Sequence, residues 1–549
     1  MGNNSFTHVD SKALAPSLII INACVHTMNI NVPTATSVAV YGNRIMAIGS
    51  TAEIHRMSGP DTHIIDACGR IVMPGFNDSH VHFLRGGFQL SSVNLRDANS
   101  PQEFVERICH FAEKRHNGQW ITGGDWDHER WPDTRLPTKE LIDPFTANIP
   151  IFVNRLDGHM ALANSLALKL AGVTRDTQDI PGGFIVRDTK TGEPTGILKD
   201  AAQSLVWKVI PDSDFEEKLV AARAATTHAA RFGVTSVHDM SGGNDVSVYQ
   251  KLLDHGELLT RIYAISSLPD WHPSERLGVH SHYNSDMLRV GGLKGFADGS
   301  LGSSTALFFE PYEDEPNAYG LAGNEMYPKD AMLKRVIAAD RHDIQVIVHA
   351  IGDKANDEIL SIYEQTLEEN TERDRRFRIE HAQHLRPQDI PRFGKAHIIA
   401  SMQPYHVIDD GCWTEKRIGK RRAQTAYAFR SLLASGATLA FGTDWNIAPL
   451  NPMLGICAAV TRRTLDGKHP HGWIPEQKIT VEEAVRAYTV GSAYAEFTDN
   501  IKGTISPGKL ADIIILSRNI FEIDPDEIKK IEVSMTIVDG NIIYEQGSI

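Results

Sequence analysis

The feature that most constrains the fold is a regular alternation of short apolar runs and longer helical stretches through the middle of the chain. This alternation is typical of repeated βα units, which build a parallel sheet. Helical stretches such as 215–231 and 331–341 separate the runs. Eight runs have strand character, and eight is the number that a closed (β/α)8, or TIM, barrel requires. The predicted barrel strands are residues 71–73, 234–238, 262–266, 287–296, 345–349, 377–380, 397–402 and 438–442.

Both ends of the chain have a different character, because short β-branched and apolar runs follow one another without helices between them. We therefore predict an α/β protein in which residues 1–72 and 505–549 form one small β-sandwich domain, with the barrel in residues 73–504. Two unrelated β caps are the alternative. The gap between the first and second barrel strands is much longer than the others, so residues 84–230 are predicted to be largely an insertion that covers the active site like a lid.

Composition limits the possible partners. The chain has 549 residues, with 55 basic and 69 acidic side chains, for a net charge of −14. The acidic balance is spread along the chain, so it predicts no nucleic-acid or membrane partner and favours a small-molecule substrate. Five cysteines lie far apart with no CxxC pair, which is typical of reduced thiols in a cytoplasmic protein. Acidic enzymes of this size are commonly dimers, so we expect a homodimer.

Histidines two residues apart follow the first apolar run. Side chains at positions i and i+2 of a strand point to the same face, so His80 and His82 can bind one metal ion from one strand end. This spacing alone is weak evidence in a chain with 24 histidines. Two other pairs lie among Pro, Ser, Gly and Asn rather than after an apolar strand, and we interpret them as surface loops: His280 with His282, and His469 with His471.

Further polar residues stand at the ends of later predicted strands. His349 and His381 close two of these runs, and Asp444 follows the last one. The carboxyl ends of barrel strands converge on one mouth, where barrel enzymes place their active sites. Each residue by itself is also consistent with a polar group satisfied by hydrogen bonds at a strand end. Together they predict a metal site at the barrel mouth.

Several motifs in this order carry a family resemblance. PGFNDSHVHF, VIVHAIGD, RIEHAQ and FGTDW resemble the amidohydrolase superfamily, in the YtcJ-like branch of metal-dependent hydrolases that includes N-substituted formamide deformylase. Residues 157–165, 294–302, 401–404 and 506–512 resemble that branch as well. The similarity runs from about residue 18 to the C-terminus. It implies a metal-dependent enzyme that hydrolyses a non-peptide C–N bond, of amide or formamide type, in a small organic molecule.

The resemblance implies a centre with one or two zinc ions, although Mn, Fe or Co suit the same donors. His80, His82 and Asp444 would hold the more buried metal, and His349 and His381 the second. In such enzymes metal-activated water attacks the carbonyl group. Asp444 would take its proton and pass it to the leaving amine.

Lys294 on the fourth predicted strand corresponds to the lysine that binuclear members carboxylate with carbon dioxide to bridge the two metals. An apolar strand favours the neutral amine that takes up carbon dioxide. The alternative is an ammonium group paired with a carboxylate such as Asp298. His159, in the segment Asp157-Gly158-His159, is the candidate donor to the oxyanion, with an ordinary buried histidine of the lid as the alternative.

Substrate contacts are harder to assign. Trp126, with Trp120 and Trp131, either lines an apolar substrate pocket or forms the core of the insertion. Asp298 and Gln403 lie in resembling segments and are predicted to bind substrate. The rival activities are a metal-dependent deaminase, a lactam or cyclic-amide hydrolase, and a catalytically inactive regulatory member. Deaminases of the superfamily have a Glu three residues after the fifth-strand histidine, where this chain has Gly352.

Overall fold

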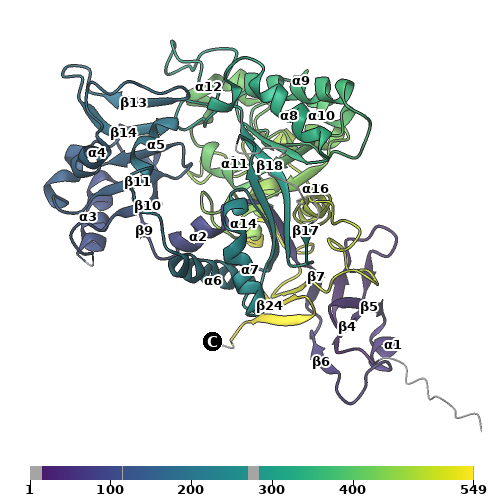
Figure 1. The fold of residues 1–549 in the computed structure, drawn as a ribbon. Helices are drawn as coiled ribbons and strands as arrows, with labels where there is room; N and C mark the ends of the chain where they lie inside the picture. Colours follow the sequence, from purple (N-terminus) through teal and green to yellow (C-terminus); the bar gives the residue numbers. More distant parts are fainter. Residues whose placement is uncertain (1–14, 114, 270–282, 548–549) are drawn as a thin grey trace, which may run out of the picture.

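The computed structural model describes residues 15–113, 115–269 and 283–547. Three regions can be followed in Figure 1. A barrel of parallel strands with helices around it occupies the centre. A sheet formed by residues between the first and second barrel strands lies on the left. Sheets formed by both ends of the chain lie at the lower right.

The barrel strands are hydrogen-bonded in chain order, from β8 at one edge of the sheet to β22 at the other. The two edges approach each other at a parallel bridge between Val81 and Trp445. The Asp444 N–H also donates to the His80 carbonyl at 2.7 Å. The result is a nearly closed eight-stranded parallel barrel. Its strands are β8 (Phe76–Val81), β15 (Val234–Asp239), β16 (Arg261–Ser267), β18 (Leu288–Phe296), β19 (Val346–Ala350), β20 (Arg378–His381), β21 (Ile399–Met402) and β22 (Leu439–Phe441).

One strand assignment from the sequence is wrong. The run predicted as the first barrel strand is β7 (Ile71–Pro74), which pairs with β2 and β23 among the terminal strands instead. The true first strand, β8, begins two residues later and carries buried polar side chains. Asp78, for example, accepts hydrogen bonds from the amide and hydroxyl groups of Thr443. These partners are distant in sequence, so the run has the appearance of a loop when it is read alone.

Helices surround the barrel and bury their apolar faces against it. In α6 the Asp214 side chain caps the helix in a capping box with Glu217, and Leu219, Ala222 and Ala225 are buried. Two of these helices, α6 and α8, have the limits expected from the sequence. The surrounding helices include α6 (Phe215–Arg231), α7 (Val246–Asp254), α8 (Ala331–Arg341), α9 (Asp353–Glu369), α10 (Ile390–Lys395), α13 (Phe429–Ala434) and α14 (Pro452–Thr461).

The two ends of the chain build two sheets with strand orders β5-β4-β1-β6 and β25-β24-β23-β7-β2-β3. Both contribute to one apolar core that includes Val38 and Ile515. A buried ion pair links the second sheet region to the barrel, because the Arg261 guanidinium donates to both oxygens of Asp512 at 2.7 and 2.8 Å. The strands are β1 (Leu18–Ile21), β2 (Cys24–His26), β3 (Thr34–Ala35), β4 (Ser37–Tyr41), β5 (Arg44–Gly49), β6 (His63–Asp66), β23 (Ile513–Leu516), β24 (Val533–Val538) and β25 (Asn541–Glu545). The predicted sandwich and its limits stay predictions.

Residues between β8 and β15 form a six-stranded sheet with the order β13-β14-β12-β11-β10-β9. It has apolar cores of its own. The helix α2 (Phe83–Gln89) leads from the barrel mouth towards this sheet. No helix in the described part of the chain has both the length and the apolar character needed to cross a membrane. The elements are β9 (Val93–Asn94), α3 (Pro101–Ala112), β10 (Ile121–Trp126), β11 (Ile151–Arg155), β12 (Met160–Ala163), α4 (Ser165–Ala171), β13 (Gly183–Arg187), β14 (Pro194–Asp200) and α5 (Ser204–Trp207).

Candidate metal centre

Three metal-ligating side chains meet where the barrel closes. His80 lies near the end of β8, His82 caps the start of α2, and Asp444 follows β22. Their donor atoms lie within 4.8 Å of one another. Asp444 Oδ1 is 3.5 Å from His80 Nε2 and 3.7 Å from His82 Nε2. Asp444 has a φ of 61°, and this turn of the backbone is part of the geometry that places its carboxylate here.

A second pair of imidazoles adjoins the first group. The ring centroids of His349 and His381 are 4.6 Å apart, and those of His80 and His381 are 4.9 Å apart. His349 lies in β19 and His381 at the end of β20. His381 has a φ of 70°. The strand alternation is therefore broken there, so both Glu380 and His381 reach the interior of the mouth.

Most of these rings are fixed by a partner on one nitrogen. His80 Nδ1 is 2.5 Å from Glu380 Oε2, and the Arg378 Nε–H donates to the other oxygen of Glu380 at 2.9 Å. His381 Nδ1 is 2.7 Å from Gln403 Oε1, and His349 Nε2 is 3.0 Å from the Gly299 carbonyl. A partner on one ring nitrogen fixes the tautomer and leaves the other nitrogen as the lone-pair donor that a metal needs.

The electrostatics of the donors suit a cation. Burial lowers the pKa of His82, His349 and His381 well below the usual value, so these imidazoles are neutral. Burial opposes ionisation of Asp444, but the neighbouring His80 and His406 outweigh it and hold the carboxyl pKa well below its usual range. Among the described residues, neither Asp444 Oδ1 nor His82 Nδ1 has a hydrogen-bond partner, although both are buried. Neutral imidazoles around an unpartnered carboxylate oxygen fit a divalent metal.

Lys294 lies on β18, the fourth barrel strand, and lines the same mouth. Its side chain is buried, with Nζ 4.6 Å from the ring centroid of Phe296. Burial lowers its pKa to about 8, although the charges of Glu380 and Asp444 oppose the shift. The amine is therefore neutral in a useful fraction of molecules near neutral pH. The alternative pairing with Asp298 is not formed, because Asp298 accepts hydrogen bonds from the amides of Leu307, Ile351 and Gly352.

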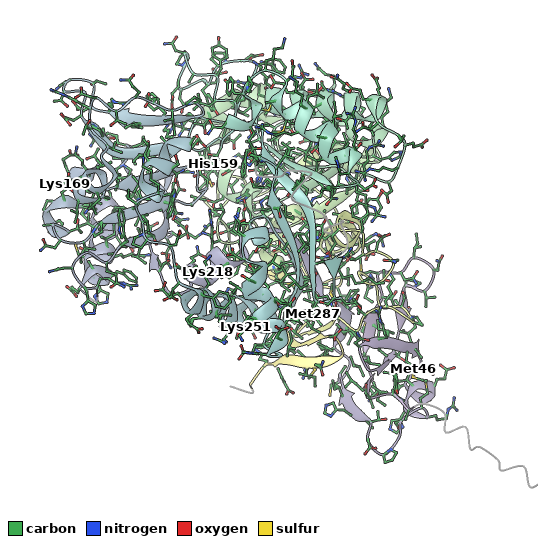
Figure 2. The ribbon with its side chains drawn as sticks, in the orientation of Figure 1. Met46, His159, Lys169, Lys218, Lys251 and Met287 are labelled. Atoms are coloured by element: carbon green, nitrogen blue, oxygen red, sulfur yellow. The ribbon has the colours of Figure 1, made fainter. Side chains whose placement is uncertain are left out.

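His159 approaches the centre from the insertion, in the turn between β11 and β12 (Figure 2). Its ring centroid is 5.2 Å from that of His349, and its Nδ1 is 2.6 Å from Asp200 Oδ1. Burial disfavours protonation, but the hydrogen bond and charge of Asp200 outweigh it and raise the pKa of His159. His159 lines the cavity and can therefore act as a charged donor there.

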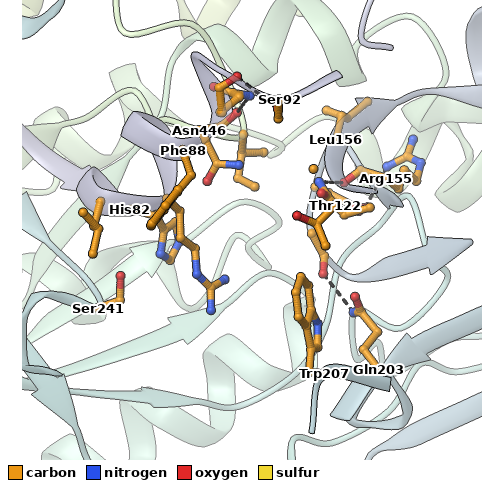
Figure 3. Close-up of a pocket in the computed structure, with 18 of the residues that line it drawn as sticks. His82, Phe88, Ser92, Thr122, Arg155, Leu156, Gln203, Trp207, Ser241 and Asn446 are labelled. Carbon is orange, nitrogen blue, oxygen red and sulfur yellow. Dashed lines mark hydrogen bonds and ion pairs between the residues drawn. The ribbon is translucent and has the colours of Figure 1, made fainter. Parts of the chain in front are cut away.

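A cavity of about 1670 Å³ lies between the barrel mouth and the insertion. His82, Phe88 and Ser241 stand on one side of it, and Thr122, Arg155 and Trp207 on the other (Figure 3). The candidate metal ligands line the cavity at the barrel mouth, and we call this part its floor: His80, His82, His349, His381 and Asp444. Its volume exceeds the roughly 300–1,000 Å³ of typical small-molecule sites, so a small organic molecule would fill only part of it.

The sequence model of the amidohydrolase family matches residues 63–544. The chain belongs to the amidohydrolase family. Among curated proteins, Protein LONG AFTER FAR-RED 3 of Arabidopsis thaliana is 39% identical over 97% of this chain and 93% of the relative. Putative amidohydrolase YtcJ of Bacillus subtilis is 32% identical over 92% of this chain and 94% of the relative. N-substituted formamide deformylase of Arthrobacter pascens is 27% identical over 96% and 98%, respectively.

A solved structure agrees with these relatives. An uncharacterized metal-dependent hydrolase from Pyrococcus horikoshii has a TM-score of 0.74 and 27% identity, and covers 92% of this chain and 99% of that one. The predicted class, a metal-dependent amidohydrolase acting on C–N bonds, is confirmed. The predicted amidohydrolase barrel is confirmed as well.

Three residues predicted to bind substrate lie elsewhere in this amidohydrolase. Trp126 is fully buried in the core of the insertion, where its indole N–H donates to the Val153 carbonyl at 2.8 Å. Gln403 holds His381, and Asp298 binds three backbone amides behind His349. None of the three belongs to the described lining of the cavity, whereas Trp120 does. Packing and hydrogen bonds engage all three, and direct substrate contact by them stays a prediction.

The sequence reading missed several residues of the centre. Arg378 and Glu380 stand two apart in a buried strand, and an ion pair at that spacing in an apolar run is a signal for a buried network. His406, whose Nε2 is 3.4 Å from Asp444 Oδ2, carried no such signal. The pair His280 and His282 lies outside the described residues. His469 and His471 lie in a loop after α14, and neither belongs to the described cavity lining.

Proposed function

We propose that this amidohydrolase cleaves an amide or formamide C–N bond of a small organic molecule. The observation that carries the proposal is the convergence of five ligating side chains on one cavity floor, with a buried Asp444 oxygen that has no hydrogen-bond partner among the described residues. Zinc fits the donors best, although Mn, Fe or Co suit them too. A divalent metal bound there would lower the pKa of water and polarise a carbonyl group.

The chain's own residues supply the remaining steps. Asp444 Oδ1 lies 3.5 and 3.7 Å from the Nε2 atoms of His80 and His82, and His406 lies beside Oδ2, so the Asp444 carboxylate can accept a proton from attacking water and return it to the leaving nitrogen. His159 can donate a hydrogen bond from Nε2 to the developing oxyanion, because Asp200 holds its other nitrogen. Residues of the insertion, among them Thr122, Arg155 and Trp207, line the cavity across from His82.

Lys294 is proposed to carry a carbamate. Its neutral amine would add to carbon dioxide, forming an N–C bond and releasing one proton. The resulting carboxylate would supply two oxygens between the two groups of ligands. The charge of Lys294 contributes to the lowered pKa of three histidines, and the charge of Asp444 acts in turn to raise the pKa of Lys294. This supports a position of Lys294 close to both groups of ligands. The three histidines are His82, His349 and His381.

Amide hydrolysis is favoured over deamination of the type that needs a Glu after the fifth-strand histidine. That position is Gly352, which begins α9. A Cβ atom there would lie 2.0 Å from the Leu307 carbonyl oxygen. A side chain at this site would therefore clash, so no acid can stand there without a backbone change. Lactams and other cyclic amides remain within the proposed substrate class.

The test is hydrolysis by protein reconstituted with zinc, measured as amine release from panels of formamides, acyl amides and lactams. Wild-type protein is expected to turn over at least one panel. Asp444→Asn is expected to bind metal less well and to lose turnover, with an unchanged melting temperature in the absence of metal. Absence of turnover on every panel by fully metal-loaded protein would contradict the proposal.

We also propose that the substrate is a small molecule rather than a nucleic acid or a membrane, that the protein is a homodimer, and that it acts in the cytoplasm. Light scattering of the purified protein tests the second, and cell fractionation tests the third.

A further inference from the structure

Arg85 is a cation on the wall of the cavity. It lies on α2, one helical turn after His82, and lines the cavity. Its side chain is accessible, but the surface it exposes faces the cavity. No residue in the described part of the chain forms a hydrogen bond or ion pair with its guanidinium. Three other cationic groups of the wall are paired: Arg155 with Asp127 and Asp157, Lys218 with Asp245, and His159 with Asp200.

The acidic groups nearest to Arg85 are already engaged. Asp239 accepts hydrogen bonds from the Tyr249 hydroxyl at 2.5 Å and from the Phe83 amide at 3.1 Å. Asp245 pairs with Lys218. Burial lowers the pKa of Arg85, which nevertheless stays charged because a guanidinium is not deprotonated in proteins. Because the Arg85 side chain is exposed on the cavity wall, its donors are available to an anion, and charge-assisted bidentate hydrogen bonds are among the strongest in proteins.

Arg85 also lies close to the metal ligands. Its charge contributes to the lowered pKa of His82, which places it within electrostatic reach of the centre. His82, Phe88 and Ser241 stand on the same side of the cavity in Figure 3, and α2 carries both His82 and Phe88. Arg85 therefore lies on the wall of the cavity that adjoins the candidate metal ligand His82.

Much of the cavity wall is apolar. Leu90, Trp207 and Val220 line the cavity and are 45%, 44% and 63% exposed. Phe88 and Ile210 line it as well. Such a wall favours an apolar body, while the guanidinium favours a planar anion such as a carboxylate.

We propose that Arg85 binds the carboxylate of the substrate, so that the enzyme acts on anionic amides with an apolar body. This inference rests on the proposed hydrolysis for its substrate class, but the anion site itself does not require turnover. Acyl or formyl derivatives of apolar amino acids have the required combination of groups.

The first experiment compares N-formylphenylalanine with N-formylphenylalanine amide as substrates of the zinc-loaded full-length protein. Arg85→Gln is expected to raise KM for the acid by about 10- to 100-fold, the effect of losing a hydrogen bond to a charged group. KM for the amide is expected to stay within about twofold, since a neutral group forms no ion pair. Arg85→Lys is expected to fall between, because it keeps the charge without the planar fork.

Arg107→Gln is the matched control. Arg107 lies on α3 outside the described lining of the cavity, and its guanidinium pairs with Glu103 at 2.5 Å. It is expected to change neither KM. Equal losses for acid and amide in Arg85→Gln, or equal effects of the two variants, would overturn the inference.

A binding experiment separates the inference from the proposed hydrolysis. Calorimetry measures phenylacetate and the neutral 2-phenylethanol on zinc-loaded wild type and Arg85→Gln. The wild type is expected to prefer phenylacetate, and Arg85→Gln to lose that preference. Preference retained in Arg85→Gln would mean that the metal holds the carboxylate, which overturns the Arg85 site. Charge-selective binding without turnover of any amide would instead contradict the proposed function alone.

Discussion

The two halves of the metal centre are held in different ways. His80, His82 and Asp444 form the first half, which barrel closure assembles, and the charged carboxylate of Glu380 backs it. His349 and His381 form the second half. The hydrogen-bond partners of its rings are neutral, namely the Gly299 carbonyl and the Gln403 amide oxygen, and the Asp298 carboxyl group lies 3.4 Å from His349 Nε2.

The two halves therefore differ in whether they can bind a metal ion independently. Three converging donors, one of them anionic, can hold a metal ion without further help. Two imidazoles alone offer too few donors, so the second half depends on a group shared with the first. Lys294 stands on β18, between β8 and β19 in the strand order, and is the residue suited to supply that group. Loss of a ligand from the first half is thus expected to abolish activity, whereas disruption of the second half is expected to lower the reaction rate.

The largest effect is expected in the first half. His80→Ala removes a donor and should lower kcat/KM by more than about 1000-fold, beyond the 10- to 100-fold typical of outer partners. Glu380 keeps its partner Arg378 in this variant, so the fold should survive. Metal analysis, activity and thermal melting check the three parts of the prediction. His471→Ala, in an exposed loop, is the control. Retention of a tenth of the wild-type activity would refute the role of the first half.

Lys294→Ala should separate the two halves. The variant is expected to bind about one metal per chain where the wild type binds about two, as in bridged two-metal sites. Its activity should fall by about 100- to 1000-fold, the effect of losing one electrostatic stabiliser of the transition state. Metal content and carbon dioxide release on acidification provide the measurement. A variant that keeps both metals would show that the second half binds without a bridge, and the contrast between the halves would fail.

Glu380→Gln tests the charged support of the first half. The amide must turn either its oxygen or its NH2 group towards His80, while Arg378 requires an acceptor on the other side. An NH2 group facing His80 Nδ1 would favour the tautomer whose Nε2 carries the proton and cannot bind metal. Metal affinity is expected to fall by about 10- to 100-fold. Competition with a chelator measures it, and Glu380→Asp, which keeps the charge, should recover part of the loss.

The ligands could be predicted from the sequence because parallel strands bring their carboxyl ends to one mouth, whatever the loops do. His80, His349, His381 and Asp444 follow from that rule. The first barrel strand could not be predicted, because the polar side chains of β8 are satisfied by partners hundreds of residues away. The role of Gln403 could not be predicted either, because a neutral amide at a strand end is consistent with binding either the substrate or a metal-ligating side chain. The structure places its oxygen 2.7 Å from His381 Nδ1.

Gln403→Ala is expected to have the smallest effect of the series. It removes a neutral hydrogen bond from His381 Nδ1, which typically changes an equilibrium by less than about tenfold. The ring stays packed against His349 and His80, so its direction should largely persist. The measurement is affinity for the second metal, obtained by titrating zinc into protein that already holds one equivalent. A loss as large as that of Glu380→Gln would mean that charge does not distinguish the two supports, since both would then act by orienting a ring.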